Sequence, residues 1–533
     1  MTDQAGVSVP VTKVADTDGD QGGDGTRTTG ARAEQIVAWA AGLLAVAISW
    51  YASRGRMATA PDSVTYLSTA ASLRAGDGFG NWLESPMATF PPGWPGVIAG
   101  VPFVSTSTAA FLVLALSLLL LPLLSLGILR RTTSSTPARI IGVVAVTLSP
   151  TVLPWTYTGL SEVPFTALVL GVVLAALASR ESRRWLWVAA GLAALAPLVR
   201  YIGVSTPIAL AAWVAFDRRR ARRWITAAGV VVIGLVPIGG LLLWNQSQAG
   251  ASMGGRTASA LSPIQAAGQA LATIGRTAVW TFDRVPTPIG LLLSVAVIAL
   301  AALAVFGARA SDVERARRGR ALLALIAVVQ TLTLIAARSR VEMDDLDGRL
   351  LATTAALVLL LAACLLGDLQ LHPSDTIRKV ALVAGVAWCV IGFGAVGRGV
   401  LTLPGGYEGD EWETARSIPA LDDVPEECRQ LTVGDVDGGE FPDCGVLANE
   451  PWGWYPSSFR PLPSPRRGPD GQSAELDRLR DAVADGSTVY VLWTTVDEPW
   501  GSYVPVADME QELKMTELGS GDGIAVYRVD GVR

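Results

Sequence analysis

Long apolar stretches separated by short charged loops dominate the chain between residues 35 and 400. Each stretch approaches the about 20 residues that a helix needs to cross the hydrocarbon of a bilayer. They lie at 35–53, 107–129, 138–155, 161–179, 185–200, 202–216, 225–244, 287–308, 321–337, 350–367 and 380–397. The pattern predicts an α-helical polytopic membrane protein with about eleven transmembrane helices. The apolar segment 91–104 is too short to span, so we expect it to be re-entrant or interfacial.

The two ends of the chain have a different pattern. Residues 1–34 are rich in Asp, Gly and Thr and show no hydrophobic periodicity, which predicts a disordered tail. Residues 401–533 read as soluble sequence. Strand-like runs at 444–451, 487–495 and 523–529 and an amphipathic helix at 473–485 predict a small C-terminal α/β domain.

The basic residues set the expected orientation. Loops 130–139, 180–184, 218–223, 309–320 and 378–379 carry the arginines and all fall on one side of the eleven-span arrangement. Basic loops stay in the cytoplasm, so residues 1–34 are expected there and 401–533 outside it. The protein is therefore expected to be a multi-pass cell-membrane protein. The abundance of Arg, Ala, Gly and Val is typical of a GC-rich bacterial genome.

Composition excludes several classes of function. The net charge of −5, without a broad basic face, argues against a nucleic-acid partner. The one histidine, His372, falls in a predicted cytoplasmic loop, which argues against a histidine-ligated zinc site or a Ser-His-Asp triad. Cys364 and Cys389 lie in apolar spans, where thiols behave as small hydrophobes. Cys428 and Cys444 lie in the C-terminal domain, where an oxidising compartment favours a disulfide over two free thiols.

Ionisable residues are scarce inside the spans. The segments 35–53, 107–129, 225–244 and 287–308 contain none. Ion-coupled transporters usually place such residues at mid-membrane depth, and a lipid-glycan flippase needs a polar path. Both remain alternatives, although the sequence shows little sign of either. The charged residues gather at the predicted outer ends of helices, which indicates a site at the outer membrane surface.

The first outer loop carries the most suggestive pattern. Val64, Leu67, Ala71 and Leu73 have the spacing of a short amphipathic helix at the interface, which Gly76 would end. Asp62 stands at the start of this helix, and Tyr66 lies one turn later. Asp62 is a candidate catalytic base; the alternative is that it only caps the helix.

Three further motifs follow in order. Ser161-Glu162 opens the fourth span, Leu198-Val199-Arg200 closes the fifth, and Asp347-Gly348-Arg349-Leu350-Leu351 precedes the tenth. With Asp62, Tyr66, Gly76 and Pro91-Pro92 they resemble the GT-C superfamily of integral membrane glycosyltransferases. The resemblance is strongest to the protein O-mannosyltransferases and aminoarabinose transferases of the family 39 type. It covers about 35–370, and each motif alone is degenerate. At the motif around Arg349 the family often has Arg-Tyr-Leu-Leu-Pro. In this chain, Leu and Ala replace the Tyr and the Pro of that motif.

The resemblance implies a reaction as well as a fold. It implies transfer of a sugar from a polyprenyl-phosphate donor, with inversion, to an envelope acceptor that is a glycan, a lipid or a protein. No Gly-rich nucleotide loop is visible, in keeping with a lipid donor. Asp62, or Glu162, would take the proton of the acceptor, and Tyr66 would contact the substrate. Arg200 and Arg349 would bind the phosphate. The alternatives are a helix-start role for Glu162 and snorkelling to lipid headgroups for the arginines.

Weaker candidates complete the sequence picture. Asp344, Asp345 and Asp347 could bind a divalent cation, or form a solvated loop, which is the more ordinary interpretation. No other cofactor is implied. Trp452 and Tyr455 could stack on a sugar or pack the C-terminal domain onto the membrane part. A GT-C-shaped protein without activity, serving envelope assembly, is a third functional alternative.

Overall fold

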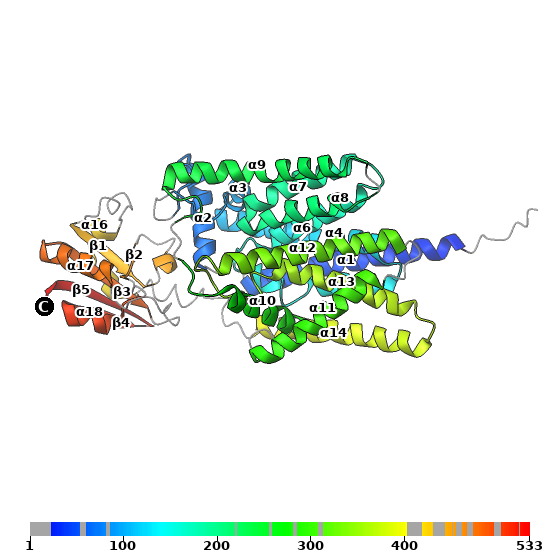
Figure 1. Cartoon of the computed structure of the whole chain (residues 1–533). Helices are drawn as coiled ribbons and strands as arrows, with labels where there is room; N and C mark the ends of the chain where they lie inside the picture. The colour runs from blue at the N-terminus through cyan, green and yellow to red at the C-terminus, as the bar shows by residue number, and fades with distance from the viewer. Residues whose placement is uncertain are drawn as a thin grey trace, which may run out of the picture.

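The computed structural model shows a long helical bundle with a small mixed domain at one end (Figure 1). We call this end of the bundle the domain end and the opposite one the far end. The structure describes residues 23–53, 60–81, 86–218, 221–254, 258–280, 285–307, 313–401, 418–429, 443–449, 451–454, 461–465, 473–494, 503–521 and 523–533.

Seven helices of the described chain are long and apolar enough to cross a membrane. They are α1 (Gly23–Ser53), α4 (Thr106–Thr132), α9 (Arg223–Ala249), α11 (Thr287–Phe306), α12 (Val313–Arg338), α13 (Ala352–Gln370) and α14 (Asp375–Leu401). Shorter apolar helices are α5 (Thr136–Thr147), α6 (Glu162–Ala178), α7 (Arg184–Val199) and α8 (Ser205–Ala215), the last preceded by η2 (Tyr201–Val204). These helices occupy the eleven predicted segments, so the prediction of a polytopic helical membrane protein is confirmed.

Two helix boundaries were predicted wrongly. Helix α1 begins at Gly23 and not near residue 35, so residues 23–34 are helical and not a disordered tail; residues 1–22 lie outside the described residues. Helix α5 ends at Thr147, well before residue 155, and η1 (Leu153–Trp155) follows it. Pro150 explains the early end, because proline cannot donate the helical hydrogen bond and restricts the residue before it.

Buried ion pairs hold the far end together. Arg320 of α12 is fully buried and donates to Asp368 of α13 and to the carbonyl oxygens of Thr132 and Ala304. Glu34 of α1 is also buried and accepts hydrogen bonds from Arg130 (2.9 Å) and Arg139 (2.7 Å). The partners come from α1, α4, α5, α11, α12 and α13, so these contacts fix the helices of the far end relative to one another.

The domain end carries three additional helices, α2 (Pro61–Ala75), α3 (Gly93–Ala99) and α10 (Pro263–Ala278). Helix α2 runs across the ends of the spanning helices (Figure 1). It ends at Gly76, as the sequence predicts, because that residue takes a φ of +90°, which glycine adopts readily. Ser68 and Thr69 are buried together with Val64 and Leu67, so α2 is covered on more sides than an interfacial helix would be.

The C-terminal domain contains a five-stranded mixed sheet in the order β2-β1-β3-β5-β4. Its strands are β1 (Cys444–Ala448), β2 (Leu462–Pro463), β3 (Thr488–Thr494), β4 (Leu513–Gly521) and β5 (Ile524–Val532). Strand β1 pairs in parallel with β2 and β3, and β5 runs antiparallel to β3 and β4. The helical elements are η4 (Pro419–Leu421), α16 (Glu426–Arg429), η6 (Pro451–Trp454), α17 (Ala474–Ala484) and α18 (Val506–Glu512). The predicted small α/β domain is confirmed.

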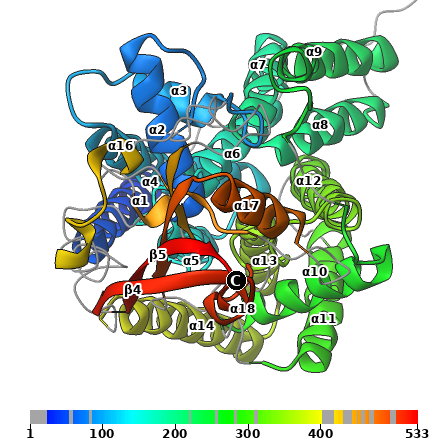
Figure 2. The same ribbon diagram turned by 90° about the vertical axis from the view of Figure 1, so that its left-hand side faces the viewer.

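The sheet separates two hydrophobic cores, because alternate residues of a strand face opposite sides. Tyr490 and Leu492 of β3 belong to one core, and Val489 and Val491 belong to the other. We call the first the inner core. It comprises Val64, Ile418, Ala420, Leu421, Val424, Cys428, Val446, Ala448, Trp454, Tyr490, Leu492, Ile524 and Val526. The second, the outer core, includes residues of α17 and α18. Seen from the domain end, the sheet, α17 and α18 lie over the middle of the bundle (Figure 2).

Candidate active site at the domain end

Four segments that are far apart in the sequence bring charged side chains together at the domain end. Asp62 lies in the first turn of α2, and Glu162 is the first residue of α6. Arg200 directly follows α7, and Arg349 lies just before α13. Carboxylates in a first helical turn interact favourably with the positive end of the helix dipole, which explains the places of both acids. The sequence motifs therefore converge on one site.

The side chains of this site form an alternating series of acids and bases. Arg349 donates from Nη1 to Oδ2 of Asp62 (2.9 Å), and its Nε lies 3.9 Å from Oε1 of Glu162. The same oxygen lies 2.6 Å from Nη1 of Arg200, which also donates to Oγ of Ser161 (3.1 Å). We call the four charged residues Asp62, Arg349, Glu162 and Arg200 the ion-pair series. Charges that are partly removed from water need such pairing.

Exposure distinguishes the two carboxylates. The side chain of Asp62 is 26% exposed, whereas that of Glu162 is only 3% exposed. A substrate can therefore reach Asp62, while Glu162 lies between the two arginines and is enclosed. The N-cap residue of α2 is Ala60, and Asp62 follows it inside the helix, so capping does not account for Asp62.

Tyr66 lies beside the ion-pair series on the same helix as Asp62. It is buried, and its ring meets the edge of the Phe90 ring at a centroid distance of 5.1 Å. Burial raises the pKa of the Tyr66 hydroxyl, and the negative charge of Asp62 adds to the effect. Tyr66 therefore stays protonated near neutral pH and can act as a hydrogen-bond donor.

A close backbone contact positions Arg200. A Cβ atom at Gly93 would lie 2.4 Å from the carbonyl oxygen of Leu198, so only glycine lets α3 approach the end of α7. Sequence reasoning named Pro91-Pro92 but missed the glycine that follows them. It also missed Asn245 of α9, whose Nδ2 donates to the Tyr201 hydroxyl (3.0 Å) next to Arg200. The available signal was the change from apolar residues to the amides Asn245, Gln246 and Gln248 at the end of the segment 225–244.

The acidic loop does not gather into a metal site. Asp344 pairs with Arg349, and burial raises the pKa of this carboxyl although the Arg349 charge opposes the effect. Asp345 accepts from Gln269 (2.8 Å), and Asp347 accepts from the backbone N–H of Leu350 (3.0 Å). Within the described ranges, no three or more His, Cys, Asp or Glu residues are grouped so that they could hold a metal ion. Asp344 instead extends the ion-pair series.

One of the two aromatic candidates belongs to a segment at the junction with the C-terminal domain. Trp452 lies in η6, which packs against α2, and Tyr455 lies outside the described residues. The neighbouring Trp454 is buried in the inner core. A disulfide joins Cys428 of α16 to Cys444 of β1, with Cα atoms 5.0 Å apart, in the same part of the domain.

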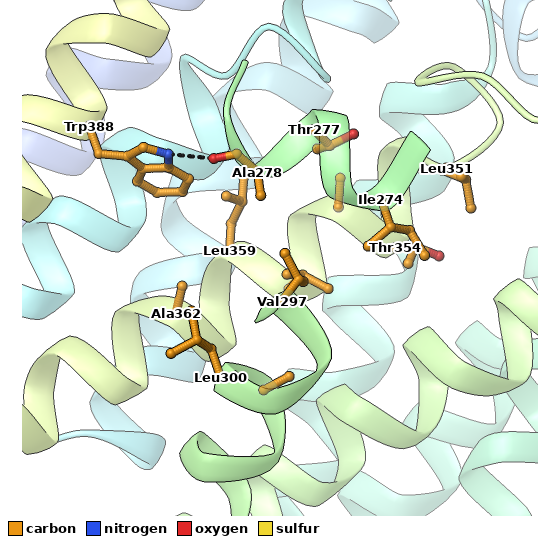
Figure 3. Close-up of a pocket in the computed structure, with 13 residues that line it drawn as sticks. Ile274, Thr277, Ala278, Val297, Leu300, Leu351, Thr354, Leu359, Ala362 and Trp388 are labelled. Carbon is orange, nitrogen blue, oxygen red and sulfur yellow. Dashed lines mark hydrogen bonds between the residues drawn. The ribbon is translucent and has the colours of Figure 1, made fainter. Parts of the chain in front are cut away.

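An apolar cavity of about 230 Å³ lies beside the site, between α10, α11, α13 and α14 (Figure 3). It begins at Leu351, two residues from Arg349, and continues along α13 to Ala362. The rise of an α-helix over that interval is about 16 Å. Trp388 of α14 also lines the cavity, and its indole N–H donates to the carbonyl oxygen of Ala278 (2.8 Å).

Known structures share this architecture. ArnT from Cupriavidus metallidurans in the apo state superposes with a TM-score of 0.56 and 12% identity, over 95% of this chain and 98% of that one. The chain has an ArnT-like fold. The same protein bound to undecaprenyl phosphate gives a TM-score of 0.50 at 12% identity, with the same coverage of both chains. The archaeal oligosaccharyltransferase AglB from Archaeoglobus fulgidus, in complex with an inhibitory peptide and a dolichol-phosphate, gives 0.54 at 11% identity, over 86% and 69% of the two chains.

The likeness to these structures concerns the fold, because the identities are low. No protein-family profile matches the sequence, and no curated protein does. The similarity of fold to ArnT covers 95% of this chain and so includes the C-terminal domain as well as the membrane bundle.

Proposed function

We propose that this protein is a glycosyltransferase that moves a sugar from a polyprenyl-phosphate donor to an extracytoplasmic envelope acceptor. The acceptor is a glycan, a lipid or a protein. The observation that carries the proposal is the ion-pair series, which lies at the domain end of an ArnT-like bundle. Two of the similar structures hold a polyprenyl or dolichyl phosphate, which supports a donor of the same class.

The donor phosphate binds the two arginines in this proposal. Guanidinium groups match phosphate oxygens in charge and geometry, and Arg349 and Arg200 are held close together through Glu162. Arg349 exchanges Asp62 for the phosphate, which frees the Asp62 carboxylate. The apolar cavity that begins at Leu351 suits the first part of the polyprenyl tail.

The proposed reaction is a single displacement with inversion at the anomeric carbon. Asp62 accepts the proton of the acceptor hydroxyl, whose oxygen forms a bond to that carbon. The bond between the anomeric carbon and the phosphate oxygen breaks, and the polyprenyl phosphate leaves with the electron pair. Arg200 and Arg349 stabilise the negative charge that develops on the leaving phosphate.

The orientation of the chain is part of the proposal. Helices α8 and α13 end, and α9 and α14 begin, at the far end (Figure 1), and the basic residues Arg218, Arg222, Arg223, Arg378 and Lys379 lie near these helix ends. The positive-inside rule then assigns the far end to the cytoplasm and the ion-pair series to the outer surface. Lipid-linked sugars reach that surface, whereas nucleotide sugars stay in the cytoplasm.

Complementation of a deletion strain tests the proposal. Mass spectrometry of envelope glycans and polyprenyl-phosphate sugars should show that the deletion loses one linkage and accumulates one lipid-linked sugar. The wild-type chain should restore both, and Asp62→Asn should not. Asp345→Asn is the matched control, because this exposed carboxylate lies outside the ion-pair series. If Asp62→Asn restores the linkage fully, Asp62 is not the base. If the deletion changes neither the envelope glycans nor the lipid-linked sugars, the glycosyltransferase proposal is wrong and a non-catalytic role in envelope assembly becomes the better explanation.

A further inference from the structure

Helix α2 belongs to two hydrophobic cores at once. Tyr66, Leu67 and Ala70 pack in the core of the membrane bundle. Val64, only one turn earlier, is fully buried in the inner core of the C-terminal domain. The helix that carries Asp62 is therefore shared between the membrane part and the soluble domain, because Val64 at its start is buried by the domain and the following residues are buried by the bundle.

The first turn of α2 has no side-chain N-cap, and the Ser63 and Thr65 hydroxyls donate within it to the carbonyl oxygens of Ala60 (2.8 Å) and Pro61 (3.0 Å). Its N-cap residue is Ala60, whose side chain cannot accept a hydrogen bond. Local support comes from Ser63, whose Oγ accepts from the Ala60 backbone N–H (2.7 Å), and from the bond between the Val64 N–H and the Ala60 carbonyl oxygen (3.0 Å). Asp62 lies between these residues and accepts a hydrogen bond from Arg349 (2.9 Å), whereas Val64 supplies the contact of this turn with the C-terminal domain.

The part of the domain that covers Val64 is itself well fixed. Segment η6 packs against α2, and its Trp454 is 1% exposed. Leu421 and Val424 complete the same core, and the disulfide between Cys428 and Cys444 ties this layer to the sheet. A rigid surface of this kind transmits position, since packed interiors yield little to displacement.

We propose that the C-terminal domain is a positioning element for the Asp62 carboxylate and that it acts through Val64. This inference rests on the proposed function and adds a role for the domain within it. Val64 touches no reacting group in this account. It holds the first turn of α2 so that Asp62 lies where the acceptor proton must be taken, and a misplacement of about 1 Å can reduce a rate by about 100-fold.

A matched pair of substitutions tests the inference. Val64→Ala removes two methyl groups from the inner core next to α2. Val489→Ala removes the same groups from the outer core, on the opposite face of the sheet, where α17 and α18 pack. Both residues are fully buried, so both variants should lose thermal stability to a similar extent. Only the first should affect Asp62.

Two readouts on the full-length chain in proteoliposomes separate the outcomes. The donor is the polyprenyl-phosphate sugar extracted from the deletion strain. Val64→Ala should lower kcat by about tenfold, with the donor KM unchanged within about twofold, and Val64→Ile should retain most of kcat. Hydrogen exchange of the amides in 60–76 should be faster in Val64→Ala than in Val489→Ala.

The contrary results are distinct from a failure of the proposed function. Equal kcat in Val64→Ala and Val489→Ala, or equal exchange in 60–76, would overturn the positioning role. If the wild-type chain transfers no sugar, the proposed function fails, and the inference about Asp62 falls with it, whatever the exchange shows. If the Val64→Ala protein does not accumulate, Val64→Thr replaces it in the same two measurements, with the same expected results. Threonine keeps the shape of the side chain and introduces only a hydroxyl into the inner core.

Discussion

Replacing Asp62 by Asn isolates the proton-accepting role that we assign to this carboxylate. Asparagine has nearly the same shape and can still accept a hydrogen bond from Arg349, but its amide cannot take a proton at neutral pH. Arg349 also keeps its contacts with Asp344 and Glu162, so it does not become an unpaired buried charge. The variant should therefore fold, with a loss of stability of about 1 kcal/mol or less for a partly exposed ion pair.

The expected loss of rate is much larger than the loss of stability. A general base commonly contributes a factor of about 10²–10⁴, which corresponds to about 3–5 kcal/mol of activation free energy. Asp344→Asn is the informative companion, because it also removes a carboxylate from Arg349 but leaves Asp62 in place. If Asp62 acts as the base, Asp344→Asn should retain most of the rate. If the loss arises only from a displaced Arg349, the two variants should behave alike.

The assay measures transfer in proteoliposomes, with protein amount and thermal stability determined on the same preparations. A well-folded Asp62→Asn protein with undiminished transfer would remove Asp62 from the mechanism. Glu162 would then be the next carboxylate to test, although its 3% exposure makes it the less accessible of the two.

Other predictions follow from the same structure. Arg200→Ala should weaken donor binding or slow transfer, which kinetics at varied donor concentration will show as a higher KM or a lower kcat. Arg200→Lys should retain only part of the wild-type donor binding and rate, because an ammonium group lacks the bidentate geometry of a guanidinium group. Gly93→Ala should lower the free energy of unfolding by about 1–3 kcal/mol, measured as a lower melting temperature. Intact-mass analysis should find Cys428 and Cys444 linked by a disulfide before reduction. Removing this disulfide, whose cysteines are 16 residues apart, should lower the free energy of unfolding of the domain by about 3 kcal/mol. A reporter that is active only in the cytoplasm should stay silent at the C-terminus.

The features that the sequence predicted well are those with a local signal. Apolar length identified the spans, and Gly76 marked the end of α2 because its left-handed conformation favours glycine. Asp62, Glu162, Arg200 and Arg349 could be selected because each stands at or near the end of a predicted helix. Such ends gather at a membrane surface even when the residues are far apart in the chain.

The features that the sequence did not reveal depend on contacts between distant segments. Helix α1 extends back to Gly23, and Glu34 within this extension is tied to arginines of α4 and α5, which no local pattern could indicate. Helix α10 is an exception, because it was missed between two predicted spans although Ser262 and Gln265 at its start form a capping box. The pairing of Asp62 with Arg349 and the burial of Val64 in the C-terminal domain also depend on tertiary packing alone.

The internal pairing of the ion-pair series has a consequence for selectivity in a membrane. Phospholipid headgroups carry phosphates and vastly outnumber any lipid-linked sugar, so two bare guanidinium groups at the bilayer surface would be occupied by them most of the time. In this site Asp62 already holds Arg349, and Glu162 already holds Arg200. Under the proposed function, Asp62 is a resident competitor that an incoming phosphate must displace from Arg349, while Glu162 stays between the two arginines. A phospholipid headgroup that replaces a carboxylate at an arginine gains little binding free energy, because one ion pair is exchanged for another. A lipid-linked sugar also contributes contacts through its sugar and its long isoprenoid tail.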